Sequence, residues 1–279
     1  MVDAKTKWFG VIGNPIEHSL SPLIHNSGFK ELNINAAYLA FKVEEVKNAI
    51  DAIKEFEISG YSVTIPHKVS IMKYLDKIDQ LAKKVGAVNT VLVKKGKLIG
   101  YNTDVVGAIN PIKKITSIKG KNVFIIGAGG AARAIVLGLV KEKANVTIFN
   151  RDFSHAQKLA KEFFVSAKEL GELNSLSNDC AILINATPVG MFPNVNESPV
   201  DESFLKKGMI VFDILYNPLE TKLIKSAKKK GCKVILGVEM FLNQAYAQFE
   251  MFTGKKAPKE LMRKLVLKEL KKRQQNQHN

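Results

Sequence analysis

The sequence predicts an α/β protein, because segments with the pattern of strands alternate with segments that have the pattern of helices. The chain has 279 residues, of which 46% are hydrophobic, and can therefore bury a sizeable core and form two domains. Its first hundred residues alternate between the two patterns, and a glycine-rich turn then begins a second alternating set at roughly residues 105–238.

The first alternating set supplies seven expected segments. We expect strands at Trp8–Gly13, Ala37–Val43 and Tyr61–Ile65, a hairpin at Val88–Ile99, and helices at Pro22–Leu32, Glu44–Phe56 and Val69–Val85. In the second of these helices, Val46, Ile50 and Ile53 recur at helical spacing. This alternation is typical of a mostly parallel sheet that is covered by helices.

The second set begins with the most informative segment of the chain. The apolar strand Val123–Ile126 runs into a glycine turn and then into a helix that starts at about Ala131. A dinucleotide pyrophosphate needs this geometry, because Gly127 permits the tight turn and Gly129 lets the backbone approach the phosphates. The helix start adds N–H groups and a positive dipole end. We expect a Rossmann-like domain whose cofactor contacts Gly127, Ala128, Gly129, Gly130 and Ala131.

A glycine turn can also be plain packing, but the strands around this one complete a βαβ unit. They are expected at Asn145–Phe149, Ala181–Asn185, Met209–Ile214 and Lys233–Leu236. After Gly237 the chain is expected to be helical to its end.

The residues after the second strand of this unit favour NADP over NAD. An acid there would hold the ribose 2′-hydroxyl of NAD, whereas Asn150 and Arg151 suit the 2′-phosphate of NADP. Asp152 follows and would repel that phosphate unless it points away. The alternative is that Arg151 is an ordinary surface cation.

Ser19 and Ser21 stand just before a predicted helix whose first residue is Pro22. Their hydroxyls, beside a positive dipole end, could hold a carboxylate ligand. Alternatively, Ser21 is an N-cap.

Thr64 and Lys68 lie in the segment that joins a strand to the helix predicted at Val69–Val85. A cation in or near the first turn of a helix is unfavourable, so its pKa is lowered toward neutrality, which suits a proton donor and acceptor. The alternatives are that Lys68 extends into water and that His67 is a cap.

Other polar residues end predicted strands or face away from an apolar stripe. Asn89 and Asp104 flank the hairpin, although Asp104 would also fit as an N-cap. Thr187 and Tyr216 lie in polar turns after later strands, where cofactors bind in open α/β sheets. Gln244 lies off the stripe of Leu242, Ala245 and Phe249, so it faces either a cleft or solvent.

Composition argues against several classes of partner. The net charge is +16, but nine of the 42 basic residues lie at 255–279, with no interleaved aromatic residue, so nucleic-acid binding is not expected. No uncharged apolar run is long enough to span a bilayer, so no membrane partner is expected. Cys180 and Cys232 are far apart and form no metal motif, so we expect no metal and a cytoplasmic location.

In their joint order these motifs resemble the shikimate dehydrogenase family over nearly the whole chain. The matching segments are 19–22, 62–68, 86–90, 100–104, 127–132, 150–151, 185–191, 213–218 and 237–245. The resemblance implies two α/β domains around a cleft: a substrate domain of residues 1–104 plus 239–279, and a dinucleotide-binding domain of residues 105–238. It also implies reversible reduction of 3-dehydroshikimate to shikimate with NADPH in chorismate and aromatic amino-acid biosynthesis.

The same resemblance implies a role for each site residue. Ser19 and Ser21 would hold the substrate carboxylate. Lys68 would exchange the proton at the reacting oxygen, with Asp104 beside it. The residues that would bind or border the rest of the substrate are Thr64, Asn89, Asp104, Tyr216 and Gln244. In addition to the glycine turn, the residues that would hold NADP are Asn150, Arg151, His155, Thr187, Ile214, Gly237 and Met240.

Three positions depart from the family pattern. Members usually carry asparagine where Ser62 stands, and often threonine at Asp152 and a basic residue at His155. The last two positions grip the 2′-phosphate, so an NAD-tolerant quinate/shikimate dehydrogenase is an alternative, and a non-catalytic nucleic-acid-binding or regulatory protein is a remote one. Partners are expected to be the small-molecule substrate and at most a second copy, as a monomer or homodimer.

Overall fold

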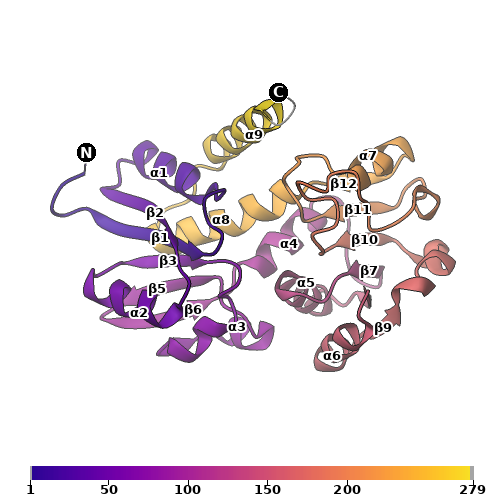
Figure 1. The fold of residues 1–279 in the computed structure, drawn as a ribbon, viewed down its shortest axis with the longest axis horizontal. Coiled ribbons are helices and arrows are strands. Elements are labelled where there is room, and N and C mark those ends of the chain that lie inside the picture. The colour runs from indigo at the N-terminus through magenta and orange to yellow at the C-terminus, as the bar shows by residue number, and fades with distance from the viewer. Residues whose placement is uncertain (1, 277–279) are drawn as a thin grey trace. The chain divides into compact units, whose positions relative to one another are not determined.

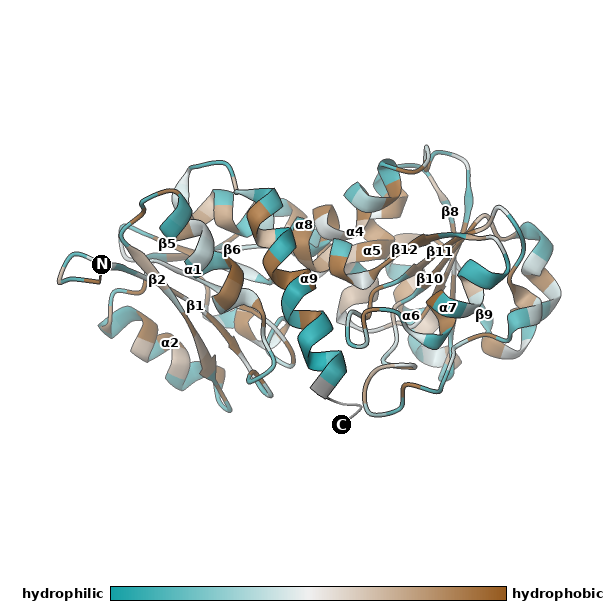
Figure 2. Cartoon of the chain, turned by 90° about the horizontal axis from the view of Figure 1, so that it is seen from above, coloured by the Kyte–Doolittle hydropathy of each residue, from teal (hydrophilic) through white to brown (hydrophobic). Residues whose placement is uncertain are grey.

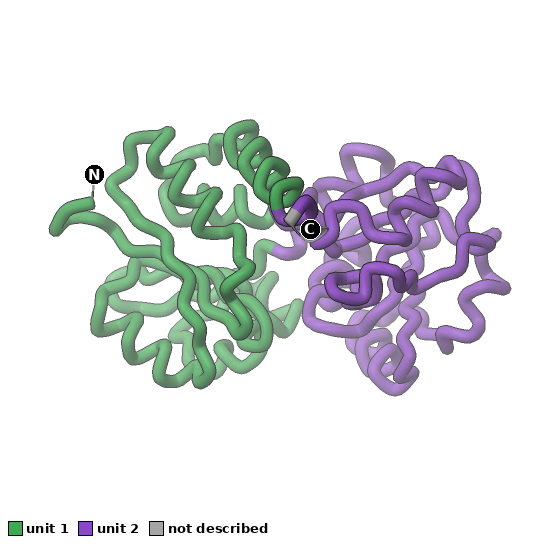
Figure 3. Tube along the Cα trace, turned by 45° about the horizontal axis from the view of Figure 1, so that its top comes forward, with its two compact units in different colours: residues 1–103, 244–272 green, residues 104–243, 273–279 purple. Residues whose placement is uncertain are grey.

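The computed structural model describes residues 2–276 (Figure 1). The chain divides into two compact units, shown separately in Figure 3. The first consists of residues 1–103 and 244–272, and the second of residues 104–243 and 273–279. Each unit contains one six-stranded sheet, which confirms the α/β class.

The sheet of the first unit has the strand order β2-β1-β3-β5-β6-β4. Its strands are β1 (Lys7–Gly13), β2 (Ala36–Lys42), β3 (Gly60–Val63), β4 (Lys77–Ile78), β5 (Thr90–Lys94) and β6 (Lys97–Tyr101). β1 is parallel to β2 and β3, and β4 is parallel to β6. β5 and β6 form the predicted hairpin, antiparallel to each other, and β5 is antiparallel to β3.

The helices of the first unit follow the predicted pattern except in one segment. Those within residues 1–103 are α1 (Ser21–Glu31), α2 (Val46–Glu55) and α3 (Gln80–Val85). The single helix predicted at Val69–Val85 is wrong: the chain forms a 3-10 helix η1 (Ser70–Tyr74), then β4, then α3. Two aspartates break the helix, because Asp76 accepts a hydrogen bond from the Leu98 N–H (2.7 Å) and Asp79 caps α3.

One apolar cluster lies between α2 and the sheet of the first unit. The predicted stripe Val46, Ile50 and Ile53 is buried in α2, against Tyr61 of β3 and Leu98 of β6. Burial of such side chains is the main term that holds the helix on the sheet.

An aromatic cluster in the first unit encloses His25. The His25 ring stacks on Tyr38 with centroids 4.4 Å apart and packs against Phe249 and Phe252. Neither ring nitrogen has a hydrogen-bond partner among the described residues. Burial lowers the pKa of His25 to about 3.

His25 is expected to make the fold sensitive to acid. The unfolded chain binds a proton at this residue below about pH 6.5, whereas the folded chain binds it only near pH 3. Stability is therefore fully present above about pH 6.5 and is lost as the pH falls toward 3. We expect the melting temperature to fall less steeply with acid in His25→Phe than in the wild type, whereas exposed His18→Phe keeps the wild-type slope. Equal slopes in all three proteins would contradict this role.

The sheet of the second unit is entirely parallel, with the order β12-β11-β10-β7-β8-β9. Its strands are β7 (Asn122–Ile126), β8 (Asn145–Asn150), β9 (Ser166–Glu169), β10 (Ile182–Asn185), β11 (Ile210–Asp213) and β12 (Lys233–Ile235). β7 is the first strand of this sheet in sequence order, and its neighbours are β8 on one side and β10 on the other. Strand order thus reverses at β7, as in dinucleotide-binding folds.

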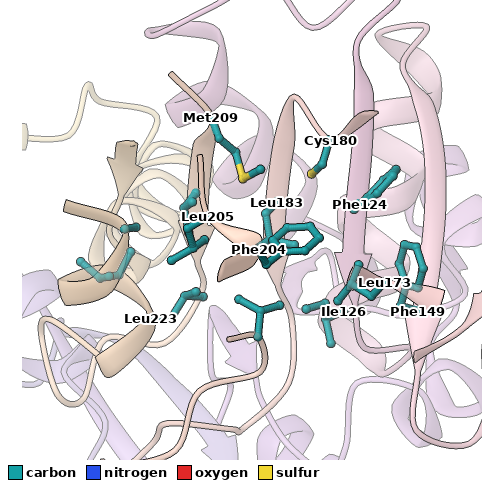
Figure 4. Close-up of a cluster of buried hydrophobic side chains, with 14 residues drawn as sticks. Phe124, Ile126, Phe149, Leu173, Cys180, Leu183, Phe204, Leu205, Met209 and Leu223 are labelled. Carbon is teal, nitrogen blue, oxygen red and sulfur yellow. The ribbon is translucent and has the colours of Figure 1, made fainter. Parts of the chain in front are cut away.

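Helices and 3-10 turns connect these strands. They are α4 (Asp104–Lys113), α5 (Gly130–Lys141), α6 (Phe153–Phe163), α7 (Lys222–Lys229), η2 (Leu170–Glu172), η3 (Asn174–Asp179) and η4 (Glu202–Phe204). Figure 4 shows the apolar core that α7 and η4 form with the sheet, where Phe204 lies near Leu183 and Phe124. β10 and β11 are buried along their whole length, which explains why the first three residues of each are apolar.

From Gly237 onward the chain forms two helices with a break between them. α8 (Gly237–Thr253) is followed directly by Gly254, which has φ of 69°. α9 (Lys259–Asn276) is largely hydrophilic (Figure 2), and its buried side chains include Met262, Val266 and Leu270. The expected helix to the chain end is thus two helices, and residues 277–279 lie outside the described part. Within the described residues, no helix is long and apolar enough to cross a membrane.

Candidate functional site

The first sheet carries its predicted substrate-binding loops at one edge. β1 and β3 are parallel, with Ile12 opposite Val63, so the segments that follow them leave the sheet on the same side. Because β5 and β6 are antiparallel, the segment before β5 and the segment after β6 lie there too, with Thr90 opposite Tyr101. The register therefore gathers the loops that carry Ser19, Lys68 and Asn89.

The serine pair begins α1 without capping it. Leu20 is the N-cap, with no side-chain bond, and Ser21 is the first helical residue, so the N-cap interpretation of Ser21 is wrong. The Ser21 backbone N–H donates to Ser19 Oγ (3.3 Å), which holds the two residues together. Ser21 is buried and Ser19 is half-buried.

Lys68 lies in a turn before the short helix η1 and not in the first turn of an α-helix. The expectation that Lys68 lies in the first turn of a long helix is therefore wrong. The turn is fixed on both sides: the Lys68 carbonyl accepts from the Val88 N–H (2.8 Å), and His67 Nε2 lies 2.7 Å from the Val43 carbonyl. His67 therefore anchors the turn by its ring, and Lys68 is half-buried and not extended in water.

Asn89 is buried and tightly held. Its Oδ1 accepts from the Thr103 N–H (2.8 Å) and from Thr90 Oγ (2.8 Å), and its Nδ2 donates to Thr103 Oγ (3.0 Å). Thr90 Oγ and the Asn89 carbonyl in turn accept from Gln248 Nε2, at 2.9 Å and 3.1 Å. Gln248 is absent from the predicted residues, although its position one helical turn after Gln244 is a signal for it.

The remaining predicted substrate residues are distributed over both units. Thr64 and Gln244 belong to the first unit and are half-buried, so Gln244 does not simply face solvent. Asp104 and Tyr216 belong to the second unit. Asp104 is buried and is the first residue of α4, and Tyr216 packs on Phe241 with ring centroids 5.3 Å apart.

The glycine turn after β7 has the shape that a pyrophosphate requires. Gly127 has φ of 115°, and a Cβ there would lie 2.8 Å from the Ala186 carbonyl oxygen, so only glycine fits. At Gly129 and Gly130 a Cβ would meet nothing within 4 Å, and α5 begins there with no side-chain cap. The backbone at the start of α5 thus has open space beside it, and a helix start of this kind fits an anionic group.

The turn after β8 shows what Asp152 does. Asp152 is the N-cap of α6: its Oδ1 accepts from the Ser154 N–H (3.0 Å) and Oγ (2.6 Å). Asn150 Nδ2 donates to the Asp152 carbonyl (2.9 Å), and His155 Nδ1 lies 3.6 Å from Asp152 Oδ2. The Ser154 hydroxyl and N–H, with His155 nearby, hold the pKa of the Asp152 carboxyl below its usual value. Asp152 therefore has a structural partner in α6, while Arg151 is exposed.

A buried polar group links the ends of β10 and β11. Asn185 Oδ1 accepts from the Thr187 N–H (3.0 Å) and Oγ (2.7 Å), and Asn185 Nδ2 donates to Asp213 Oδ1 (3.1 Å). Asp213 Oδ2 accepts from Thr221 Oγ (2.6 Å), and burial raises the pKa of Asp213 to about 6. These bonds fix the position of Thr187 beside the glycine turn.

Two of the residues expected to hold NADP, Ile214 and Gly237, are in direct contact. A Cβ at Gly237 would lie 2.2 Å from the Leu215 carbonyl oxygen and 2.4 Å from Ile214, so the start of α8 touches the loop after β11. Met240, one turn along α8, is buried. Residues 2–276 contain no group of three His, Cys, Asp or Glu side chains that could hold a metal ion.

Three family models match the chain. The substrate binding domain of shikimate dehydrogenase matches residues 11–91, and the shikimate/quinate 5-dehydrogenase model matches residues 111–225. The C-terminal domain of shikimate 5′-dehydrogenase matches residues 237–267.

Relatives match along nearly the whole chain. Shikimate dehydrogenase (NADP⁺) of Methanococcus maripaludis (strain C6) is 44% identical and covers 95% of this chain and 98% of its own length. A crystal structure of shikimate dehydrogenase in complex with NADP⁺ has 43% identity and a TM-score of 0.93, and covers 97% of this chain and 98% of its own. Shikimate 5-dehydrogenase from Listeria monocytogenes, in complex with shikimate and NAD, has 33% identity and a TM-score of 0.88, with coverages of 95% and 98%.

Proposed function

Because the chain belongs to the shikimate dehydrogenase family, we propose that it catalyses the reversible reduction of 3-dehydroshikimate to shikimate with NADPH. The observation that carries this proposal is a strand order that reverses at β7, where a glycine turn meets the start of α5. The step belongs to the route to chorismate and the aromatic amino acids.

The substrate is held mainly by hydroxyl and carboxamide side chains. The hydroxyls of Ser19 and Ser21 bind its carboxylate, supported by the bond that ties these residues together at the start of α1. Thr64, Asn89 and Gln244 bind its hydroxyls, and Tyr216 borders its ring. The shared sheet edge supports the grouping of the loops that carry Ser19, Thr64 and Asn89.

Lys68 exchanges the proton at the reacting oxygen, and Asp104 tunes and orients Lys68. NADPH, when bound, supplies the hydride for the carbonyl carbon. The fixed turn around Lys68 supports this role, because general acid–base catalysis needs a group held within hydrogen-bond reach of the reacting atom.

The cofactor is held by the second unit. The open space at Gly129 and Gly130 accommodates the pyrophosphate, and Arg151 and His155 bind the 2′-phosphate, next to Asn150. Thr187, Ile214, Gly237 and Met240 line the nicotinamide side, supported by the contact between Gly237 and Ile214. Asp152 does not serve as the acid of an NAD site, because α6 uses its carboxylate as a cap.

An NAD-tolerant quinate/shikimate dehydrogenase is the second candidate. His155 in place of a stronger base favours it, as does the NAD in the Listeria monocytogenes structure. We further propose that the enzyme works in the cytoplasm as a monomer or homodimer, with small molecules as partners and no nucleic acid.

A matrix of two cofactors against two substrates tests this function. Purified protein with NADP⁺ and shikimate is expected to produce NADPH absorbance. Its kcat/KM with NADP⁺ should be at least about tenfold above that with NAD⁺, because the 2′-phosphate adds charge-assisted hydrogen bonds. Equal kcat/KM values for both cofactors would favour the second candidate. No turnover with any pair would contradict the enzyme assignment.

A further inference from the structure

A chain of buried hydrogen bonds crosses the sheet of the first unit. Tyr38 Oη donates to Ser62 Oγ (2.6 Å), and Ser62 Oγ donates to Gln248 Oε1 (2.9 Å). Gln248 Nε2 donates to Thr90 Oγ (2.9 Å), and Thr90 Oγ donates to Asn89 Oδ1 (2.8 Å). All five side chains are at most 5% exposed.

Backbone groups fix which atom donates and which accepts in each of these hydrogen bonds, because a backbone group has only one hydrogen-bonding role. The Asn89 carbonyl can only accept, and it lies 3.1 Å from one end of the Gln248 carboxamide, so that end is the nitrogen. The oxygen of Gln248 therefore faces Ser62, whose hydroxyl must donate to it. The lone pairs of Ser62 Oγ are then left to accept from Tyr38.

The same reasoning fixes the carboxamide of Asn89. Because Gln248 Nε2 donates to Thr90 Oγ, the single Thr90 proton goes to Asn89 Oδ1. The Thr103 N–H, which can only donate, points at the same oxygen (2.8 Å). The acceptor end of Asn89 is thus bound on two sides, which leaves Nδ2 as its donor end and prevents the carboxamide from turning over.

We propose that Gln248 is a positioning residue, which fixes the donor end of Asn89 toward a substrate hydroxyl without touching the substrate itself. This inference rests on the proposed function. Gln248 reaches Ser62 across 186 residues of sequence, and the short serine side chain leaves room for its carboxamide. A variant that loses the carboxamide at position 248 but gains one at position 62 should therefore preserve the network of hydrogen bonds. A variant that only loses the carboxamide at position 248 should not.

Three variants distinguish a positioning role of Gln248 from a role in folding alone. Gln248→Ala is expected to raise the KM for shikimate about tenfold, the effect of losing roughly one well-oriented hydrogen bond, with the KM for NADP⁺ within about twofold of wild type. Ser62→Asn/Gln248→Ala is expected to return the KM for shikimate to within about threefold of wild type. Ser62→Asn alone is expected to lower the melting temperature more than the double variant does, because two carboxamides then compete for one space.

Gln275→Ala, which removes an exposed glutamine near the end of α9, serves as the matched control and should leave both KM values unchanged. An unchanged KM for shikimate in Gln248→Ala, or no recovery in the double variant, overturns the inference while the wild-type activity leaves the proposed function intact. Absence of shikimate turnover by the wild type overturns both. If Gln248→Ala does not fold, the double variant decides: near-wild-type KM supports the inference, and an unfolded double variant overturns it.

Discussion

Replacing Lys68 with methionine is expected to lower kcat for shikimate oxidation by about 10²- to 10⁴-fold, the usual contribution of a positioned general acid or base. Methionine keeps the unbranched stem but cannot exchange a proton. The KM for shikimate should change only a few-fold, because the serine pair and Asn89 still bind the substrate. Steady-state kinetics with saturating NADP⁺ measures both constants.

Lys84→Met provides the control for this prediction. Lys84 is exposed on α3, and its replacement removes the same charge from the same unit. It should leave kcat within about twofold of wild type, in line with the small effects of surface substitutions. If Lys68→Met kept kcat within tenfold of wild type while it bound shikimate normally, the acid–base role of Lys68 would be wrong.

Replacing Arg151 with alanine is expected to weaken NADP⁺ binding about 10- to 100-fold and to leave NAD⁺ binding unchanged. The variant loses charge-assisted hydrogen bonds to the 2′-phosphate, each worth roughly 1.5–3 kcal/mol. Calorimetric titration of each cofactor in the absence of substrate gives the two dissociation constants directly and does not depend on turnover.

The matched control is Lys158→Ala, which removes a positive charge from an exposed position on α6. Its effect on NADP⁺ binding should be no more than about threefold, because exposed charges that make no contact are screened by salt. An equal loss of affinity for both cofactors in Arg151→Ala would mean that Arg151 does not read the 2′-phosphate.

The elements that the sequence predicts well are those whose own residues are buried. β10 and β11 are apolar except for the last residue of each, and the stripe of α2 is visible from spacing alone. β9 and β4 are different: Ser166–Glu169 is polar and at a sheet edge, and Lys77–Ile78 is only two residues long. These strands form because β8 and β6 offer hydrogen bonds to them. Such pairing depends on the tertiary structure and cannot be predicted from the local sequence pattern.

The candidate site divides in the same way. Gly127 is recognisable from sequence because its requirement is local: a positive φ and a close neighbour. The role of Asp152 depends on the direction of its carboxylate. That direction becomes known only when the structure shows Asp152 as the N-cap of α6. The link between Ser62 and Gln248 spans most of the chain, so only the folded sheet brings the two residues together.

The first unit is discontinuous in sequence, and this has a consequence for synthesis of the protein. Residues 1–103 leave the ribosome long before residues 244–272, yet Gly28 packs against Phe249 and Ser62 bonds to Gln248. The amino-terminal segment therefore cannot close its interior until residues 244–272 have been translated. The second unit has its whole sheet within residues 104–243 and can mature earlier, in reverse of the usual amino-terminal-first order.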